Sequence, residues 1–116
     1  MILFVEIIKD WHFRDNKKRK KGKKNNGKHP SLIVGKSNDN KKYINIGLTH
    51  EQYRGHHKNI EIKDPTDWKK KSYLRDDVRE DDFLQLETIL NNYKLHPNDR
   101  EKVHKIINKY KKKNSH

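Results

Sequence analysis

Short apolar stretches separated by polar turns dominate the first half of the chain. Residues 2–8 are almost continuously apolar, and residues 31–36 have an apolar centre at 32–34. Residues 43–48 and 59–63 alternate between apolar and polar side chains. Both patterns are typical of β-strands. The polar stretch at 37–41 has the composition of a turn, so we expect the second and third strands to form a hairpin.

The residues that border these strands refine the prediction. Pro30 is expected to open the second strand, and Pro65 is expected to end the fourth. Residues 11–13 follow the first strand and are expected to cap the sheet, with Trp11 in the core. Residues 73–79 are mostly polar and are compatible with a short edge strand.

After position 82 the apolar spacing changes from two residues to three and four. This spacing predicts an amphipathic helix over 82–93, with Phe83 in the core and Asp81 and Asp82 at its N-terminus. Pro97 is expected to begin a second helix. The apolar stripe of that second helix consists of Val103, Ile106, Ile107 and Tyr110. We therefore expect a mainly β fold with α-helices, in which a small antiparallel barrel is followed by two C-terminal helices.

Positive charge is concentrated in two segments. The chain of 116 residues has 29 Lys and Arg against 16 Asp and Glu, a formal net charge of +13. Residues 14–28 hold nine basic residues and one acid, and residues 102–116 hold six lysines and no acid. We expect one domain over 1–116 that carries a mobile basic loop at 14–28 and a basic tail at 111–116.

A polyphosphate backbone is the natural partner of such basic segments. The residues expected to bind it are Lys17, Lys18, Arg19, Lys20, Lys21, Lys23, Lys24 and Lys28. Two alternatives remain open: an acidic protein partner, or a lysine-rich surface that only keeps the chain in solution.

Several classes of site are disfavoured by the composition. The absence of cysteine excludes disulfides, thiolate zinc sites and cysteine nucleophiles. No apolar run approaches the ~20 residues of a membrane span, so we expect a cytoplasmic protein without a membrane partner. Adjacent His56 and His57 would point to opposite faces of a strand, and the acidic cluster at 76–82 is interpreted as a solvated edge and a helix start. We therefore expect no metal and no cofactor.

The order of the elements resembles the MazF/PemK-like toxins, small endoribonucleases with an SH3-like barrel. His29-Pro30 before the strand SLIVG is similar to the family's Arg-Pro, and Thr49-His50 ends the next strand where the family has a Pro-Ile-Thr-Ser-like turn. Residues 57–62 (HKNIEI) are similar to a following His-Val-Glu-Ile strand. The resemblance covers residues 2–110. It implies an SH3-like barrel, a homodimer and an acidic antitoxin.

The resemblance also implies metal-independent cleavage of single-stranded RNA, with departures at the catalytic positions. His29 stands in place of the family's arginine, His50 in place of the serine after Thr49, and Gly47 in place of a proline. Attack of the 2′-hydroxyl on its own phosphate needs a base, an acid and positive charge. The roles implied are acid or phosphate clamp for His29, phosphate orientation for Thr49 and base for His50.

Two further residues complete the predicted site. Arg54 is a candidate for the fixed positive charge that the missing arginine would have supplied, and Tyr43 is a candidate for stacking on bases. Two other functions stay open: a barrel that binds nucleic acid without cleaving it, and a basic phage or mobile-element protein that inhibits an acidic partner. His29, Thr49 and His50 would then be ordinary turn and strand-end residues.

Overall fold

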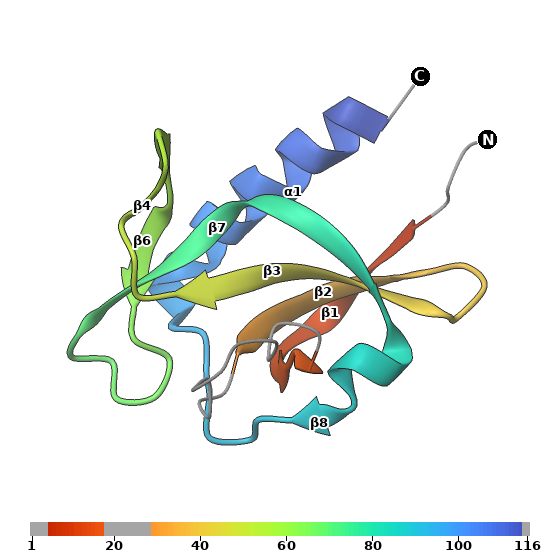
Figure 1. Ribbon diagram of the computed structural model, residues 1–116, viewed down its shortest axis with the longest axis horizontal. Coiled ribbons are helices and arrows are strands. Elements are labelled where there is room, and N and C mark those ends of the chain that lie inside the picture. Colours follow the sequence, from red (N-terminus) through yellow and green to blue (C-terminus); the bar gives the residue numbers. More distant parts are fainter. Residues whose placement is uncertain (1–4, 18–28, 115–116) are drawn as a thin grey trace.

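The computed structural model describes residues 5–17 and 29–114 (Figure 1). The chain forms an antiparallel sheet, a small separate hairpin and a C-terminal helix, so the mainly β character predicted from the pattern is confirmed. The elements, in chain order, are β1 (Val5–Asp15), β2 (Pro30–Ser37), β3 (Lys42–Thr49), β4 (Tyr53–Arg54), β5 (His57–Lys58), β6 (Ile60–Lys63), β7 (Lys71–Asp82), a 3₁₀ helix (Phe83–Leu86), β8 (Thr88–Ile89), a further 3₁₀ helix (Pro97–Asp99) and α1 (Arg100–Asn114).

The large sheet has six strands in the order β6-β7-β3-β2-β1-β8, and neighbouring strands are antiparallel. The predicted hairpin of β2 and β3 is confirmed, with Ser31 facing Gly47 and Lys36 facing Tyr43. The edge strands β6 and β8 do not pair with each other in the part of the chain that the structure describes. The described sheet is therefore open, and the closed barrel expected from the sequence is not confirmed.

Strand β1 is longer at its C-terminal end than its apolar run predicts. It continues through residues 11–13 to Asp15, so these residues lie within the strand and do not cap it. Close to β1, a Cβ atom on Gly35 would lie 2.5 Å from the carbonyl oxygen of Glu6. Only glycine permits this approach of the two backbones.

The prediction of a short edge strand at 73–79 is wrong in length and in position. β7 has 12 residues and lies between β6 and β3. Its pairing with β3 contains a bulge, since Ile46 faces Val78 while Leu48 faces Leu74. A bulge breaks the alternation of inward and outward side chains, which is why the sequence pattern fails to show a long strand here.

The predicted helix over 82–93 is also wrong. The segment begins as a 3₁₀ helix, continues as β8 and then becomes irregular. Leu86 is buried, but Leu84 and Ile89 are exposed, so the apolar side chains do not share one helical face. The backbone N–H of Leu90 donates to the carbonyl of Phe13 (2.9 Å), which ties the segment to β1. The described part of the chain thus has one α-helix after the sheet instead of two.

The second predicted helix is confirmed as α1. Figure 1 shows that α1 crosses one side of the sheet behind β7 and β3. Val103, Ile106 and Ile107 are buried, and the hydroxyl of half-buried Tyr110 donates to Glu80 (2.8 Å). No helix among the described residues is both long and apolar enough to cross a membrane. The core that α1 covers contains Phe13, Leu32, Val34, Ile44, Ile46, Ile62, Leu74 and Leu90.

The 3₁₀ helix Pro97–Asp99 and the start of α1 cover the outer edge of β6. The backbone N–H of Lys63 donates to Oδ2 of Asp99 (2.9 Å), and Nζ of Lys102 donates to the carbonyl of Glu61 (2.7 Å). These side chains form hydrogen bonds with backbone groups of β6 that could otherwise pair with another strand. The arrangement protects this edge of the sheet against pairing with other chains.

Candidate active site

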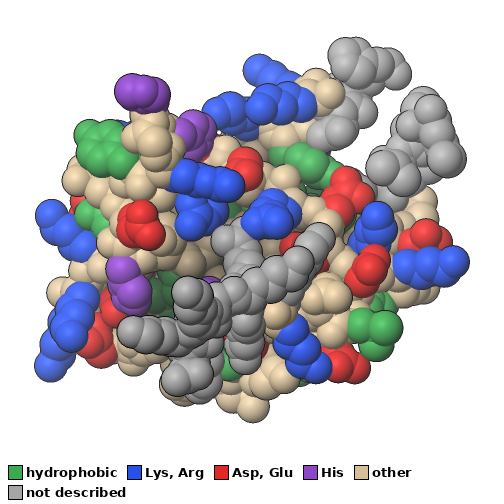
Figure 2. All heavy atoms as spheres, in the orientation of Figure 1, with side chains coloured by type: hydrophobic (Ala, Val, Ile, Leu, Met, Phe, Trp, Pro, Cys, Tyr) green, Lys and Arg blue, Asp and Glu red, His purple; other side chains and the backbone are tan. Residues whose placement is uncertain are grey.

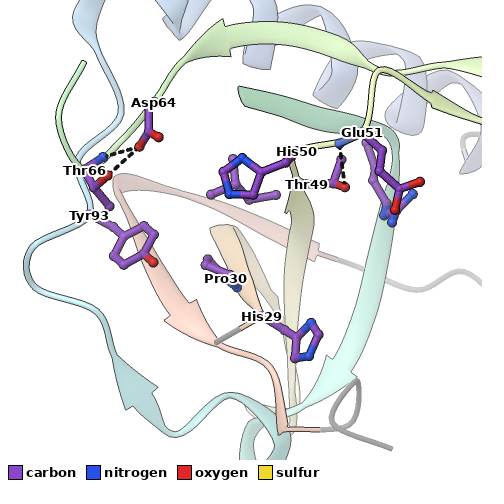
Figure 3. Close-up of a pocket in the computed structure, with 10 residues that line it drawn as sticks. His29, Pro30, Thr49, His50, Glu51, Asp64, Thr66 and Tyr93 are labelled. Carbon is purple, nitrogen blue, oxygen red and sulfur yellow. Dashed lines mark hydrogen bonds between the residues drawn. The ribbon is translucent and has the colours of Figure 1, made fainter. Parts of the chain in front are cut away.

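The hairpin of β2 and β3 brings three predicted site residues together. His29 precedes β2, while Thr49 ends β3 and His50 follows it, so antiparallel pairing places them at the same end of the hairpin. All three line a cavity of about 410 Å³, shown in Figure 3. The other residues that line it are Pro30, Leu48, Glu51, Asp64, Thr66, Arg75 and Tyr93. Their shared position agrees with the sequence argument; their chemical roles stay predictions.

Backbone hydrogen bonds on both sides fix the position of His29. Its N–H donates to Oδ1 of Asp15 (2.8 Å), and its carbonyl accepts from the N–H of Asn16 (2.8 Å). Nε2 of the His29 ring is buried and has no hydrogen-bond partner among the described residues. A buried polar atom without a partner costs free energy, so a ligand that hydrogen-bonds to this nitrogen would be favoured.

Arg75 is a pocket residue that the sequence did not indicate. It lies on β7 within the bulge, one residue after Leu74. Its Nε atom, like Nε2 of His29, is buried without a hydrogen-bond partner in the described part of the chain. A guanidinium keeps its charge at any accessible pH and has a donor geometry that matches phosphate. We call His29, Thr49, His50 and Arg75 the anion end of the pocket.

His50 and Glu51, the two polar residues that follow β3, line the cavity on its exposed side. The Oγ1 atom of Thr49 accepts from the backbone N–H of Glu51 (3.2 Å), which fixes the turn after the strand. His50 and Glu51 are both exposed. The pocket thus has an imidazole and a carboxylate that are accessible to solvent and able to accept a proton.

A second group of polar residues, the Asp64 wall, comprises Asp64, Thr66 and Tyr93. In Figure 3 these three lie together on one side of the cavity, His29 lies across from them, and His50 lies between. Oδ1 of Asp64 accepts from the backbone N–H (2.8 Å) and the hydroxyl (2.6 Å) of Thr66. The wall is therefore held in place by a turn that Asp64 and Thr66 form between them.

Burial and hydrogen bonding act in opposite directions on Asp64. Burial alone would raise the pKa of Asp64, but the hydrogen bonds from Thr66 and the nearby charges of His50 and Lys70 outweigh it and lower the pKa. The pKa of Tyr93 is raised by burial and by the negative charges of Asp64 and Asp15. At neutral pH the wall therefore has an ionised carboxylate beside a protonated phenol.

The structure does not bring Arg54 to this pocket. Arg54 belongs to the exposed hairpin of β4 and β5, where it lines a smaller cavity with His57, Asn59 and Asp77. Arg75, and not Arg54, is the arginine that lines this pocket among the described residues. The alternation of β7 is hidden by its bulge and by the charged run 75–77, so no pattern marked Arg75.

Tyr43 has little free ring surface. The ring of Phe83 lies 4.2 Å from the Tyr43 ring centroid, and Cζ of Arg14 lies 4.6 Å from it. The aromatic ring and the guanidinium at these distances compete with a base for the ring surface of Tyr43, and its role in stacking stays a prediction. Phe83, expected in the core, is half-buried in this stack, and Trp11 is half-buried against the core.

Only one of the predicted phosphate-binding residues of the basic loop is described. Lys17 is exposed, and its Nζ lies 2.7 Å from Oε1 of Glu87. Lys18, Arg19, Lys20, Lys21, Lys23, Lys24 and Lys28 lie outside the described residues.

Within the described ranges, 5–17 and 29–114, no group of three or more His, Asp and Glu side chains could hold a metal ion. The acidic cluster at 76–82 is used in internal contacts. Asp76 lies 3.4 Å from Nε2 of His57 and 2.9 Å from Nζ of Lys109, and Asp81 accepts from Nδ2 of Asn45 (3.1 Å). The expectation that the protein needs no metal stays a prediction.

Comparison with known proteins found no relative: no protein-family model matches the chain, and no curated protein and no solved structure is similar to it. The functional argument therefore depends on the chemistry of the pocket.

Proposed function

We propose that this protein is a cytoplasmic MazF/PemK-like protein of the SH3-like kind that binds single-stranded RNA and cleaves it without a metal. The observation that carries the proposal is the pair of buried nitrogens, Nε2 of His29 and Nε of Arg75, that lack partners among the described residues and line one pocket with His50. Two such groups in a partly enclosed cavity favour an oxyanion, and a phosphodiester is the oxyanion that the basic segments would attract.

The anion end contains the groups that this reaction requires. His50 would take the proton of the 2′-hydroxyl, with Glu51 beside it as a second acceptor. The 2′-oxygen then attacks the phosphorus, and His29 would protonate the departing 5′-oxygen. Arg75 and the Thr49 hydroxyl would stabilise the non-bridging oxygens as charge develops on them. The products are a 2′,3′-cyclic phosphate and a 5′-hydroxyl, and no metal or cofactor takes part.

Substitution of the two arginines tests the proposal. Arg75→Ala should lower the single-turnover rate of cleavage of a labelled single-stranded RNA in excess EDTA by about 10² or more, because one preorganised oxyanion donor is lost. Arg54→Ala is the matched control: it removes the same charge from an exposed hairpin outside the pocket and should leave the rate nearly unchanged. Full activity of Arg75→Ala would overturn the assignment of this pocket, and an intact RNA with the unsubstituted protein at every pH would overturn catalysis.

A second cavity supports a second candidate function, the binding of an acidic protein. This cavity of about 620 Å³ lies between α1, β6 and β7. It combines apolar side chains with four lysines and with the carboxylates Glu61 and Asp76. The excess of ammonium groups suits an acidic peptide with apolar anchors. The residues concerned are Ile60, Tyr73 and Ile106 for the apolar part, and Lys58, Lys102, Lys105 and Lys109 for the charge.

An acidic antitoxin, or an acidic target that the protein inhibits, would be such a partner. We also propose that the protein is a homodimer. If acidic-protein binding is the main function, the complex with the acidic partner should persist after nuclease treatment. In a separate incubation, the pure protein should leave single-stranded RNA intact.

A further inference from the structure

The cleavage proposed above leaves one side of the pocket without a role. The anion end accounts for the phosphate, but the Asp64 wall on the other side contacts none of the reacting atoms in that scheme. A cavity of about 410 Å³ lies within the range of small-molecule sites, ~300–1,000 Å³, and is far larger than a phosphate group requires. The pocket therefore has room for a group attached to the phosphate.

Asp64 has unused capacity to accept hydrogen bonds. Its residue is only 7% exposed, and the two donors from Thr66 both go to Oδ1. No described residue donates a hydrogen bond to Oδ2 of Asp64. An acceptor oxygen that has no donor among the described residues, on a side chain that is largely buried, favours a ligand that presents N–H donors.

Among the four RNA bases, guanine fits this acceptor best. Its Watson–Crick edge presents two adjacent donors, N1–H and the N2 amino group, and one carboxylate oxygen can accept from both. Adenine and cytosine present one amino group next to a ring nitrogen that repels a carboxylate, and uracil presents one N–H between two carbonyls. Single-stranded RNA exposes these edges to proteins.

The other residues on this side provide a surface for a flat ring. Tyr93 lines the cavity together with Leu48 and Pro30, and its ring is supported by Phe13 at a centroid distance of 5.9 Å. Aromatic and apolar side chains of this kind stack on bases without distinguishing among them. Discrimination would therefore come from Asp64.

We propose that the Asp64 wall recognises guanine, so that the ligand of the pocket is a guanosine phosphate unit with its base at Asp64 and its phosphate at the anion end. This inference rests on the proposed function for the phosphate end only. The unit is chemically the same in RNA and in a free nucleotide.

Binding of free nucleotides by calorimetry tests the inference without cleavage. 3′-GMP and 3′-IMP have the same charge and differ by the N2 amino group. The electrostatic contribution of the basic segments to the two affinities is therefore the same and cancels in their ratio. The protein should bind 3′-GMP at least about tenfold more tightly than 3′-IMP, and more tightly than 3′-AMP, because a hydrogen bond to a charged acceptor is lost. Equal affinities for 3′-GMP and 3′-IMP would exclude a free nucleotide as the ligand. Together with the absence of a guanosine preference in the oligonucleotide described below, they would overturn the inference.

Asp64→Asn gives the complementary test. Asparagine keeps the Oδ1 acceptor of the Thr66 turn but replaces Oδ2 by an amino group, which opposes the donors of guanine. The variant should lose the preference for 3′-GMP over 3′-AMP. Asp67→Asn, in the same loop but exposed and outside the pocket, should keep it. A preference that survives in a folded Asp64→Asn variant would overturn the assignment of Asp64.

An oligoribonucleotide with a single guanosine in a uridine tract, compared with its adenosine counterpart, separates the two sources of the ligand. A guanosine preference confined to the oligonucleotide supports RNA, and one confined to 3′-GMP supports a free nucleotide; no preference in either overturns the inference. Cleavage without any base preference would support the proposed function and overturn recognition of guanine. A 3′-GMP preference without cleavage would support recognition of guanine and overturn the proposed catalysis.

Discussion

In the proposed MazF/PemK-like assignment His29 stands where the family has arginine, and its surroundings suit an imidazole that contacts a ligand. The hydrogen bonds of its backbone to Asp15 and Asn16 hold it just before β2, and its buried Nε2 has no partner among residues 5–17 and 29–114. Arg75 supplies a permanent charge in the same cavity. The pocket therefore combines a guanidinium, which stays charged, with an imidazole, which is able to act as a general acid.

This combination predicts a pH dependence for RNA cleavage. If His29 acts as the acid, single-turnover cleavage in EDTA should weaken as pH rises from about 6 to 8, because the reaction then requires the protonated form of this residue. His29→Arg should keep cleavage and remove this pH dependence, and His29→Ala should lose most activity. Thr49→Ala should lower the rate without moving the pH profile. A fully active His29→Ala would show that His29 takes no part in the reaction.

The sequence could predict one side of this pocket but not the other. His29, Thr49 and His50 flank two strands joined by a short turn, so their proximity follows from local pairing alone. Arg75 reaches the pocket through a bulge in β7, and Asp64 through a turn after β6. Both positions depend on contacts between distant segments, which no spacing in the sequence records.

At the scale of elements, the same apolar spacing led to one correct and one wrong helix. In α1 the residues at 103, 106 and 107 are buried against the sheet, and a 3₁₀ helix begun by Pro97 leads into it. In the segment 82–93 the bond from Leu90 to Phe13 and the pairing of β8 with β1 replace helical bonds. In residues 82–93, hydrogen bonds to distant parts of the chain outweighed the weak intrinsic preference of the segment for a helix.

The packing of α1 gives a prediction about one helix face. Ile106 is 4% exposed, so Ile106→Asp buries a charge without a partner and should lower the free energy of unfolding by several kcal/mol, or dissociate a dimer. Asn108→Asp adds the same charge on the exposed side and should be mild. Thermal melting and sedimentation velocity measure both effects. Equal tolerance of the two substitutions would contradict the packing of α1 on the sheet.

At the scale of the whole molecule, charge is divided between a mixed surface and two basic segments. On the face shown in Figure 2, Lys and Arg side chains of the described residues are interspersed with Asp and Glu side chains. Much of the net charge of +13 is concentrated in residues 14–28 and 102–116. Affinity for a polyanion should therefore come mainly from these segments, and base recognition and chemistry from the pocket.

The last prediction separates these two contributions. If the basic loop makes about six phosphate contacts, affinity for single-stranded RNA should fall by ~10³ between 50 and 200 mM salt. Replacement of Lys17, Lys18, Arg19, Lys20 and Lys21 by Ser should flatten this salt dependence. Thermal stability should barely change, because the exposed contact of Lys17 with Glu87 is of a kind worth at most about 1 kcal/mol.

The matched control for that loop variant is replacement of Lys111 and Lys113 by Ser at the end of α1. Both side chains are exposed, and the change removes charge from the other basic segment. Fluorescence anisotropy across a salt series should show a smaller change of slope per charge removed for this control than for the loop variant. An unchanged slope in the loop variant would remove the loop from the binding surface, since each lost phosphate contact must reduce the number of counterions released.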